Sequence, residues 1–366
     1  MRRCSPDRTA VFVDDKVAIV SLRFNPGFIQ TLIAYAAAMR ELGCEVEFLL
    51  DPAYCGFTEL TAIAPVIQAH GSEVTGSWRY AVFVNPSTRN GELGASLKKQ
   101  GTKILYVYHE PWQISLDFLR GEGLAGTLRA IVAHHMTVPI LRLADCILLP
   151  SRTALAVYHT ADARYNPRAT YVPLIFDDDT AGDVLETLPG KRYFSFIGKP
   201  CRSHAFDQFT AAMRYAFKAG WDVRFLIAAR QPLPDSVSRD PLIRKHMHQI
   251  EIRCGRPLNN QEMNRCYAES YCVWNLYRRS TQSGVLPKAF MFGTPVIASE
   301  IGSFPEFVQD RVTGRFSSAE NHEHLWNAVK EMKENLAAYA MHCRRSFCET
   351  FYYRSCLPML ERLLQS

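Results

Sequence analysis

Short apolar runs alternate with helix-length amphipathic segments along most of the chain. Residues 16–21 form a continuous apolar run, which is typical of a parallel strand buried on both faces, and residues 45–50 are predicted as the second strand. Residues 28–42, between these runs, are rich in Ala, carry apolar residues at helical spacing and stop at Gly43, which predicts a helix. Strand, helix and strand in this order form a βαβ unit, so the pattern predicts an α/β protein with parallel sheets.

The same alternation continues through both halves of the chain. Further strands are predicted at residues 80–85, 103–108, 145–150, 169–175, 192–198, 222–228, 251–254 and 271–276. Further helical segments are predicted at residues 116–143, 205–219, 260–269, 322–336 and 343–364. Ser151, and Asn259 or Asn260, stand where helix N-caps are expected.

An acidic segment with Gly and Pro, residues 177–191, separates two copies of this pattern and has the composition of a linker. A chain of 366 residues is also long enough for two domains. We therefore expect an N-terminal Rossmann-like domain at 1–176, a linker at 177–191, and a second Rossmann-like domain at 192–342. The last helix, 343–366, is long enough to cross back to the first domain.

Basic residues follow two strands of the second half. Lys199 and Arg202 come after strand 192–198, and Arg278 and Arg279 come after strand 271–276. Ligands of open α/β sheets bind at the carboxyl ends of the strands, and Arg and Lys both suit phosphate groups. A single cation of this kind is usually a solvated surface residue, but the set predicts a diphosphate site.

The stretch 281–299 predicts a phosphate cradle. A small polar loop leads into a short apolar helix, which ends at Gly293 before a strand. A loop at a helix N-terminus presents bare backbone N–H groups to an anion. The candidate binding residues here are Thr281, Gln282, Ser283, Gly284, Val285 and Lys288.

Three residues of the first half are candidates as well. Gly27 lies in the turn between the first strand and its helix, and His109 and Glu110 directly follow strand 103–108. Their positions at strand ends favour a binding site. Each also has a plain structural explanation, namely a glycine that only shapes a turn and a histidine that is satisfied by its neighbours.

Composition and charge narrow the class of protein. Hydrophobic residues at 48% and charged residues at 21% indicate a folded globular chain. A net charge of +6 suits an anionic ligand or membrane surface but is too weak to indicate nucleic acid. The eleven scattered Cys without C-x-x-C spacing, the lack of a signal-peptide pattern and the lack of an uninterrupted apolar run of about 20 residues favour a cytoplasmic protein.

Residues 116–143 form a basic, apolar helical region. Such a helix can lie on an anionic membrane surface or pack against the sheet, and packing is the favoured interpretation. A peripheral contact with the inner face of a membrane stays open as an alternative.

A block that begins at Gly293 resembles a known family. The matching residues are Gly293-Thr294-Pro295-Val296-Ile297-Ala298-Ser299, Ile301-Gly302, Pro305-Glu306 and Val312-Thr313-Gly314. Together they resemble the carboxyl-terminal signature of the family-4 glycosyltransferases (glycosyl transferases group 1). The resemblance implies the GT-B fold, with two facing Rossmann-like domains and a cleft between them. It also implies roles for Gly27 in the first glycine-bearing loop, for His109 near the acceptor, for Ser151 at the opening of a helix and for Gly198-Lys199 beside the donor diphosphate.

The chain departs from this family at two positions. The family usually carries two Glu with seven residues between them, and Ser280 and Lys288 stand at those positions here. In the family, the first Glu is associated with the donor sugar and the second with the ribose of the nucleotide. A carboxylate accepts hydrogen bonds from hydroxyl groups, whereas a Lys only donates. The sugar or the ribose must therefore be held by other groups, for which Glu300 and Glu306 are candidates.

The resemblance implies a hexosyl-type glycosyltransferase that retains the anomeric configuration and uses a nucleotide-sugar donor. Lys199, Arg202 and the N–H groups of 283–285 would stabilise the leaving diphosphate, and His109 would orient a hydroxyl. Neither a metal nor another cofactor is expected. The expected acceptor is a glycan or a lipid-linked glycan, in polysaccharide or glycoconjugate synthesis. The alternatives are a non-catalytic binding or scaffold member, which the missing Glu residues favour, and a nucleotide-sugar epimerase, for which no acid/base pair is visible.

Overall fold

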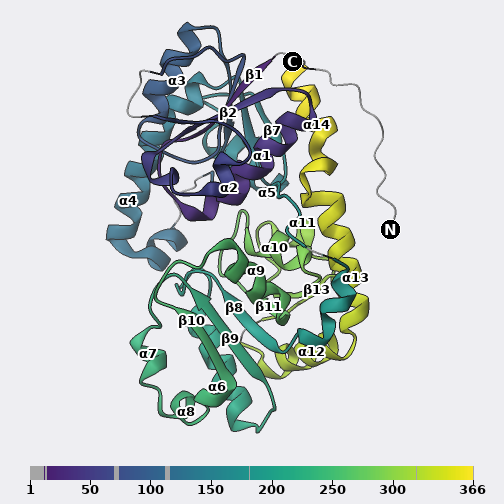
Figure 1. Cartoon of the computed structure of the whole chain (residues 1–366). Helices are drawn as coiled ribbons and strands as arrows, with labels where there is room; N and C mark the ends of the chain where they lie inside the picture. Colours follow the sequence, from purple (N-terminus) through teal and green to yellow (C-terminus); the bar gives the residue numbers. More distant parts are fainter. Residues whose placement is uncertain are drawn as a thin grey trace. The chain divides into compact units, whose positions relative to one another are not determined.

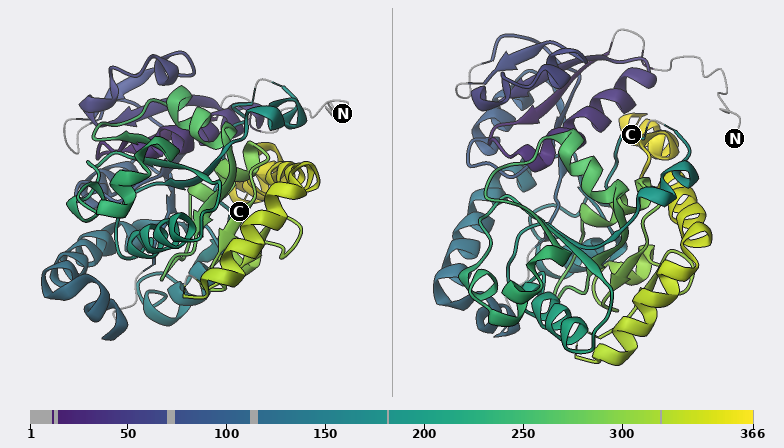
Figure 2. Two further views of the ribbon diagram at one scale, coloured as in Figure 1. Left: turned by 90° about the horizontal axis from the view of Figure 1, so that it is seen from below. Right: turned by 60° about the horizontal axis from the view of Figure 1, so that its bottom comes forward.

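The computed structural model describes residues 12, 15–69, 74–111, 116–180, 182–318 and 320–365. The chain forms two compact units, the first made of Met1–Asp177 and Tyr352–Ser366, the second of Asp178–Phe351. Each unit is a parallel sheet with helices on both faces (Figures 1 and 2). The prediction of an α/β protein with two Rossmann-like halves is therefore confirmed.

The sheet of unit 1 has seven parallel strands in the order β3-β2-β1-β4-β5-β6-β7. The strands are β1 Lys16–Ser21, β2 Glu45–Leu50, β3 Val66–Gln68, β4 Tyr80–Phe83, β5 Lys103–Val107, β6 Cys146–Leu149 and β7 Ala169–Tyr171. The strand order reverses direction between β1 and β4. In open α/β sheets this switch point is where the loops diverge and leave a crevice for a ligand.

Alternate residues of the unit 1 strands supply two separate cores. Val17 and Ile19 pack on one face with α1 (Ile29–Glu41) and α14 (Tyr353–Gln365). Ala18 and Val20 lie in the core of the other face, which is covered by α3 (Asn90–Lys99), α4 (Leu116–Leu143) and α5 (Arg152–Ala161). Successive side chains of a strand point to opposite faces, so strands covered on both sides read as continuous apolar runs.

The long helix α4 is bent near its start. Gly123 has φ 70° and ψ 175°, which interrupts the helix and is accessible to glycine at little cost. By length and composition alone, Gly123–Leu143 is the one helix in the described part of the chain that is long and apolar enough to cross a membrane. The sequence pattern did not predict such a segment, because charged and polar residues interrupt its apolar run.

The sheet of unit 2 has six parallel strands in the order β10-β9-β8-β11-β12-β13. They are β8 Tyr193–Ile197, β9 Arg224–Ala229, β10 Ile250–Cys254, β11 Ser270–Asn275, β12 Val296–Ala298 and β13 Gly314–Phe316. The α-helices of this unit are α6 Phe206–Lys218, α7 Asp235–Ser238, α8 Pro241–Lys245, α9 Asn260–Ala268, α10 Val285–Met291, α11 Phe304–Phe307, α12 His322–Glu334 and α13 Leu336–Ser346. The switch point of this sheet lies between β8 and β11.

Two local predictions were wrong. Residues 343–364 do not form one helix, because α13 ends at Ser346, a π-helical turn spans Phe347–Phe351, and α14 begins at Tyr353. Residues 178–191 are not a free linker, because they belong to unit 2 and include the 3-10 helix Val184–Gly190. The spacing of apolar residues does not reveal a π-helical turn between two helices. An acidic composition does not prevent a segment such as 178–191 from packing against a domain.

Candidate functional site

The predicted basic loops of unit 2 lie together at its switch point. The loop after β8 spans residues 198–205, and the loop after β11 spans 276–284. The backbone N–H of Arg278 donates to the carbonyl oxygen of Ser203 at 2.9 Å, which joins the two loops directly. Lys199, Arg202 and Arg278 are therefore carried by two loops in contact.

Arg278 is engaged within the protein. Its guanidinium donates to the carbonyl oxygen of Arg202 at 2.8 Å and to both carboxylate oxygens of Asp207 at 2.7 Å. These hydrogen bonds lower the pKa of Asp207. A phosphate would have to displace a bidentate carboxylate to reach this guanidinium, so Arg278 fixes the shape of the site.

Lys199 and Arg202 are two cations of these loops that remain available to a ligand. Both are exposed, and no described residue pairs with either side chain. The backbone that carries them is held firmly, since the His204 ring stacks on Tyr277 at 4.3 Å and the His204 carbonyl accepts from the indole of Trp274 at 3.2 Å. Unpaired cations on a fixed loop are what a bound diphosphate requires.

Cys201 is a site residue that the sequence did not indicate. Burial alone would raise the pKa of its thiol, but hydrogen bonds from His204 and Ser203 lower this pKa to about 7. Its Sγ lies 3.1 Å from the Ser203 Oγ. A thiol with a lowered pKa is the kind that becomes ionised near neutral pH, and Cys201 lies in the loop that carries Lys199 and Arg202.

The polar loop before α10 contains buried groups without partners. The Oε1 of Gln282 is buried and accepts no hydrogen bond from the described residues. At the end of β11, Asn275 is fully buried, and both its Oδ1 and its Nδ2 lack partners in the same part of the chain. Buried polar atoms are normally satisfied, so these atoms indicate a bound water or ligand. The helix itself has only seven residues, so its dipole adds less than predicted.

Two glycines of the recognised signature determine the shape of this region. A Cβ on Gly302, whose φ is +55°, would lie 1.7 Å from the carbonyl oxygen of Ser280, and a Cβ on Gly314 would lie 2.4 Å from that of Val296. Neither position therefore accepts a side chain without movement of the backbone. These two glycines thus fix a backbone arrangement beside the polar loop.

Lys288 forms a buried ion pair. Its Nζ donates to Asp179 Oδ2 at 2.5 Å and to Asn264 Oδ1 at 2.9 Å. The same Asp179 oxygen accepts from the side-chain amides of Asn260 and Asn264 at 3.1 Å each. A carboxylate is thus present beside position 288, but it comes from the acidic segment that was predicted to be a linker. Glu300 and Glu306, the candidates for holding the sugar or the ribose, stay predictions.

Replacing Lys288 with Met is expected to destabilise the protein by about 3 kcal/mol, because Asp179 would be left mostly buried without its partner. The double replacement of Lys288 by Met and Asp179 by Leu should recover most of this loss. Denaturant unfolding of both single variants and the double variant measures the coupling. Arg256→Met breaks an exposed ion pair with Glu262 in the same unit and should change little. If the losses of stability in the two single variants added up in the double variant, the ion pair would be contradicted.

In unit 1, the structure places the Gly27 turn against His109. The Nε2 of His109 donates to the carbonyl oxygen of Val84 at 2.7 Å, and its ring meets the edge of Phe28 at 4.7 Å. The N–H of Gly27 donates to Asn25 Oδ1 at 3.0 Å, which closes the turn. Because a carbonyl only accepts, Nε2 carries the proton, and Nδ1 is left as an acceptor. The third candidate of this unit, Glu110, is exposed.

Burial lowers the pKa of His109 to about 4, although the hydrogen bond to Val84 opposes this. In the unfolded chain this histidine has a pKa near 6.5. Between about pH 6.5 and 4 the unfolded chain therefore binds a proton at residue 109 that the folded chain does not bind. Stability should be complete above this window and fall as the pH falls through it, by about 2 kcal/mol between pH 7 and 5. Unfolding at both pH values should show a smaller drop in His109→Gln, which keeps a donor but does not titrate. An equal drop in both proteins would contradict the buried, neutral histidine.

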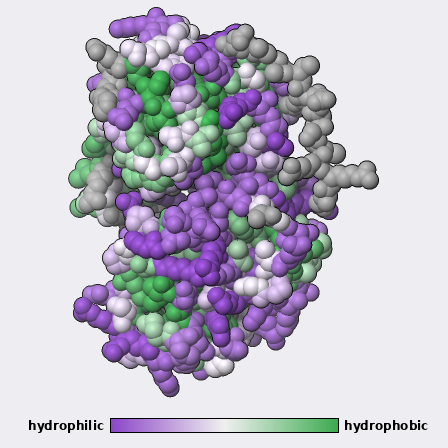
Figure 3. Space-filling model, viewed as in Figure 1, coloured by the Kyte–Doolittle hydropathy of each residue, from purple (hydrophilic) through white to green (hydrophobic). Residues whose placement is uncertain are grey.

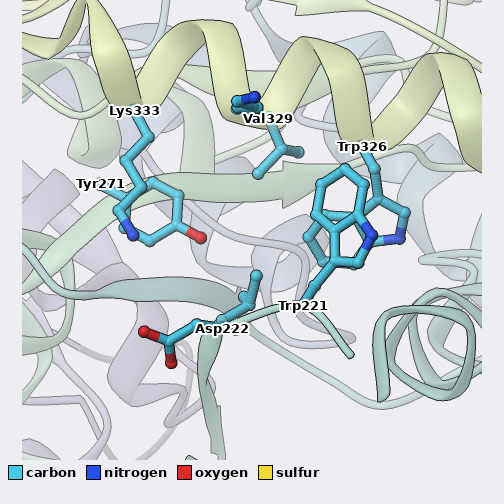
Figure 4. Close-up of a pocket in the computed structure, with 8 residues that line it drawn as sticks. Trp221, Asp222, Tyr271, Trp326, Val329 and Lys333 are labelled. Atoms are coloured by element: carbon cyan, nitrogen blue, oxygen red, sulfur yellow. The ribbon is translucent and has the colours of Figure 1, made fainter. Parts of the chain in front are cut away.

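A cavity of about 280 Å³ lies at the other end of the unit 2 strands (Figure 4). Trp221, Asp222, Tyr271, Trp326 and Lys333 line it, and the ammonium of Lys333 lies 5.3 Å from the centre of the Tyr271 ring. Trp221 precedes β9 and Tyr271 is near the start of β11. The cavity is therefore at the amino edge of the sheet and is separate from the basic loops.

Comparison with known proteins supports the fold and the family of unit 2. Residues 191–335 match the sequence model of the family described as "Glycosyl transferases group 1". A search of curated proteins finds no significant match. The matched residues contain both basic loops, the polar loop before α10 and the glycine signature.

Solved structures share the fold over nearly the whole chain. Sucrose-phosphate synthase from Thermosynechococcus elongatus has 15% identity and a TM-score of 0.71, covering 96% of this chain and 98% of its own. TarM of S. aureus has 9% identity and a TM-score of 0.72, covering 97% and 99%. HepE of Anabaena, solved in complex with UDP, has 13% identity and a TM-score of 0.66, covering 96% and 99%. At these identities the likeness establishes the GT-B fold.

Proposed function

We propose that this chain, a GT-B protein whose second unit matches the glycosyl transferases group 1, transfers a hexosyl-type group from a nucleotide-sugar to an acceptor hydroxyl. The observation that carries the proposal is the pair of unpaired cations, Lys199 and Arg202, on the fixed loop at the switch point of unit 2. Their charge complements a diphosphate, and their position is where open α/β sheets bind ligands.

In this mechanism the acceptor oxygen forms a bond to the anomeric carbon as the bond between that carbon and the diphosphate oxygen breaks. The electron pair of the broken bond stays on the diphosphate, which takes up the proton of the acceptor hydroxyl. Lys199 and Arg202 stabilise the charge that develops there, and each such preorganised group typically contributes a factor of about 10²–10³ in rate. The loop N–H groups of 283–285 assist. Neutral His109 accepts a hydrogen bond from a hydroxyl through Nδ1 and so orients it. Retention of configuration and independence of metal ions are part of the proposal, on the strength of the family resemblance.

The ribose of the donor is proposed to donate a hydrogen bond to the carboxylate of Asp179. The Oδ2 of this carboxylate is saturated by Lys288 and two amides, whereas no described residue donates to its Oδ1. A carboxylate oxygen of this kind accepts from a hydroxyl, which Lys288 itself cannot do. Because HepE was solved with UDP and with UDP-glucose, uridine donors are the first to test. We propose a cytoplasmic enzyme of polysaccharide or glycoconjugate synthesis.

A non-catalytic member that only binds a nucleotide-sugar is the second candidate. The observation that favours it is the lack of an acidic residue at positions 280 and 288. Incubation with UDP-sugars, with and without glycan acceptors, separates the two. A transferase releases UDP and extends the acceptor, whereas binding without turnover supports the scaffold. Conversion of the free nucleotide-sugar into its epimer would indicate an epimerase instead.

A further inference from the structure

A cavity of about 380 Å³ lies in unit 1, and its lining includes none of the site residues assigned above. Its polar lining comes from the loops after β1, β2 and β4, that is, Arg23, Asp51, Ser87, Thr88 and Arg89. These loops leave the carboxyl edge of the sheet on both sides of its switch point, where a crevice for a ligand is expected.

The cavity carries one net positive charge. Arg89 is neutralised, since its guanidinium donates to Asp51 Oδ2 at 2.6 Å and to the carbonyl oxygens of Leu22 and Ala69. Arg23 is exposed, and its side chain has no partner among the described residues. With the hydroxyls of Ser87 and Thr88 nearby, this lining suits a singly charged anionic group such as a phosphodiester.

The same cavity opens onto an apolar stripe of α4. Its wall includes Met136, which is the last of four large apolar side chains spaced four residues apart. Their exposed fractions are 74% for Leu124, 61% for Leu128, 55% for Val132 and 43% for Met136. Residues four apart share one face of a helix, so the stripe is about 18 Å long. In the view of Figure 3, hydrophobic residues are exposed at the edge of unit 1 where Figure 1 places α4.

The C-terminal part of α4 indicates that this helix does not span a membrane. Ile140 and Leu141, near the C-terminal end of the helix, are fully buried in the core of unit 1. A membrane-spanning α4 would pull these residues out of that core. A helix that is apolar on its outer face and fixed by its inner face has the character of an interfacial helix.

We propose that unit 1 docks on an anionic lipid bilayer, with the α4 stripe in the interface and a lipid phosphate in the Arg23 cavity. Residues 123–143 contain two Arg and two His but neither Asp nor Glu, which favours an anionic surface. A single row of four side chains offers about 400 Å² at most, whereas a stable protein–protein interface takes about 800 Å² from each partner. The cavity and the stripe are continuous. A lipid matches this arrangement, because it has a charged head group and an apolar chain.

The experiment is flotation of the full chain with phosphatidylglycerol vesicles and with phosphatidylcholine vesicles. We expect flotation with the anionic vesicles, weakened at high salt. The variant with Leu128→Gln and Val132→Gln should lower partitioning by roughly tenfold per side chain. Arg23→Gln should reduce the preference for anionic over neutral vesicles by roughly fivefold. Met341→Gln, which removes an exposed apolar side chain in unit 2, is the matched control and should float like the wild type.

Several results would overturn the proposal. The first is the absence of flotation at low salt, and the second is flotation that the stripe variant leaves unchanged. The third is a doubled mass in light scattering that the stripe variant abolishes, because this result would indicate that a second protein chain covers the stripe. Thermal stabilisation by glycerol 3-phosphate without flotation would indicate a free phosphate ligand. UDP binding, measured in parallel, should be equal in wild type and variants, so the docking surface and the proposed transfer reaction succeed or fail separately.

Discussion

Replacing Gly302 with Ala is expected to abolish donor binding and to lower the free energy of unfolding by about 2–5 kcal/mol. The new Cβ would overlap the carbonyl oxygen of Ser280, and an L-residue is strained at the φ of +55° found here. Relief requires movement of the backbone at Ser280, which begins the polar loop before α10. The measurement is denaturant unfolding together with UDP-induced thermal stabilisation.

Gly190 provides the matched control for this substitution. A Cβ on Gly190 meets nothing within 4 Å, so Gly190→Ala should stay within about 0.5 kcal/mol of the wild type and keep its ligand response. If Gly302→Ala behaved like Gly190→Ala, the close approach of residues 302 and 280 would not exist as described. If Gly302→Ala lost stability but still bound UDP fully, the contact between residues 302 and 280 would have no role in the donor site.

Replacing Lys199 or Arg202 with Ala is expected to lower the rate of UDP release from the donor by about 10²–10³ for each residue. Both act on the same leaving group, so the double variant should fall short of the product of the single effects. Because both side chains are exposed and make no ion pair with the described residues, stability should be nearly unchanged. Initial rates of UDP release, with and without acceptor, provide the measurement.

Lys218→Ala removes a cation from the other end of α6 and serves as the control for net charge. It should keep the wild-type rate. Wild-type rates in both Lys199→Ala and Arg202→Ala, with every nucleotide-sugar that is turned over, would remove the phosphate assignment. A loss of the same size in Lys218→Ala would indicate a general effect of charge.

The parts of the fold that were predictable from sequence are those that leave a local pattern. Strands Lys16–Ser21 and Glu45–Leu50 were predicted to the residue, because both are rich in apolar residues and a helical segment that stops at Gly43 separates them. Helix Asn90–Lys99 was missed, since its sequence is mixed and lacks a clear start. The break between α13 and α14 was missed because apolar residues continue through it.

The site divides in the same way. Lys199 and Arg202 were found because the rule that ligands bind at strand ends requires only the positions of the strands. The pair of Lys288 and Asp179 was not found, since 109 residues separate its members and only the folded chain joins them. The engagement of Arg278 by Asp207 and the cavity beside α4 depend on the same kind of long-range contact. Sequence therefore indicated which groups were available, and the structure showed which of them are already paired.

Thermal unfolding of the full chain with UDP, GDP, ADP and dTDP tests the central claim most directly. At about 100 times its dissociation constant, a ligand that binds only the folded chain adds about 2.7 kcal/mol of stability. We predict a clear rise in melting temperature with at least one of these nucleotides, lost when Lys199 and Arg202 are both replaced with Ala. No rise with any of them, or an equal rise in the double variant, would contradict a nucleotide-sugar site at the basic loops of unit 2.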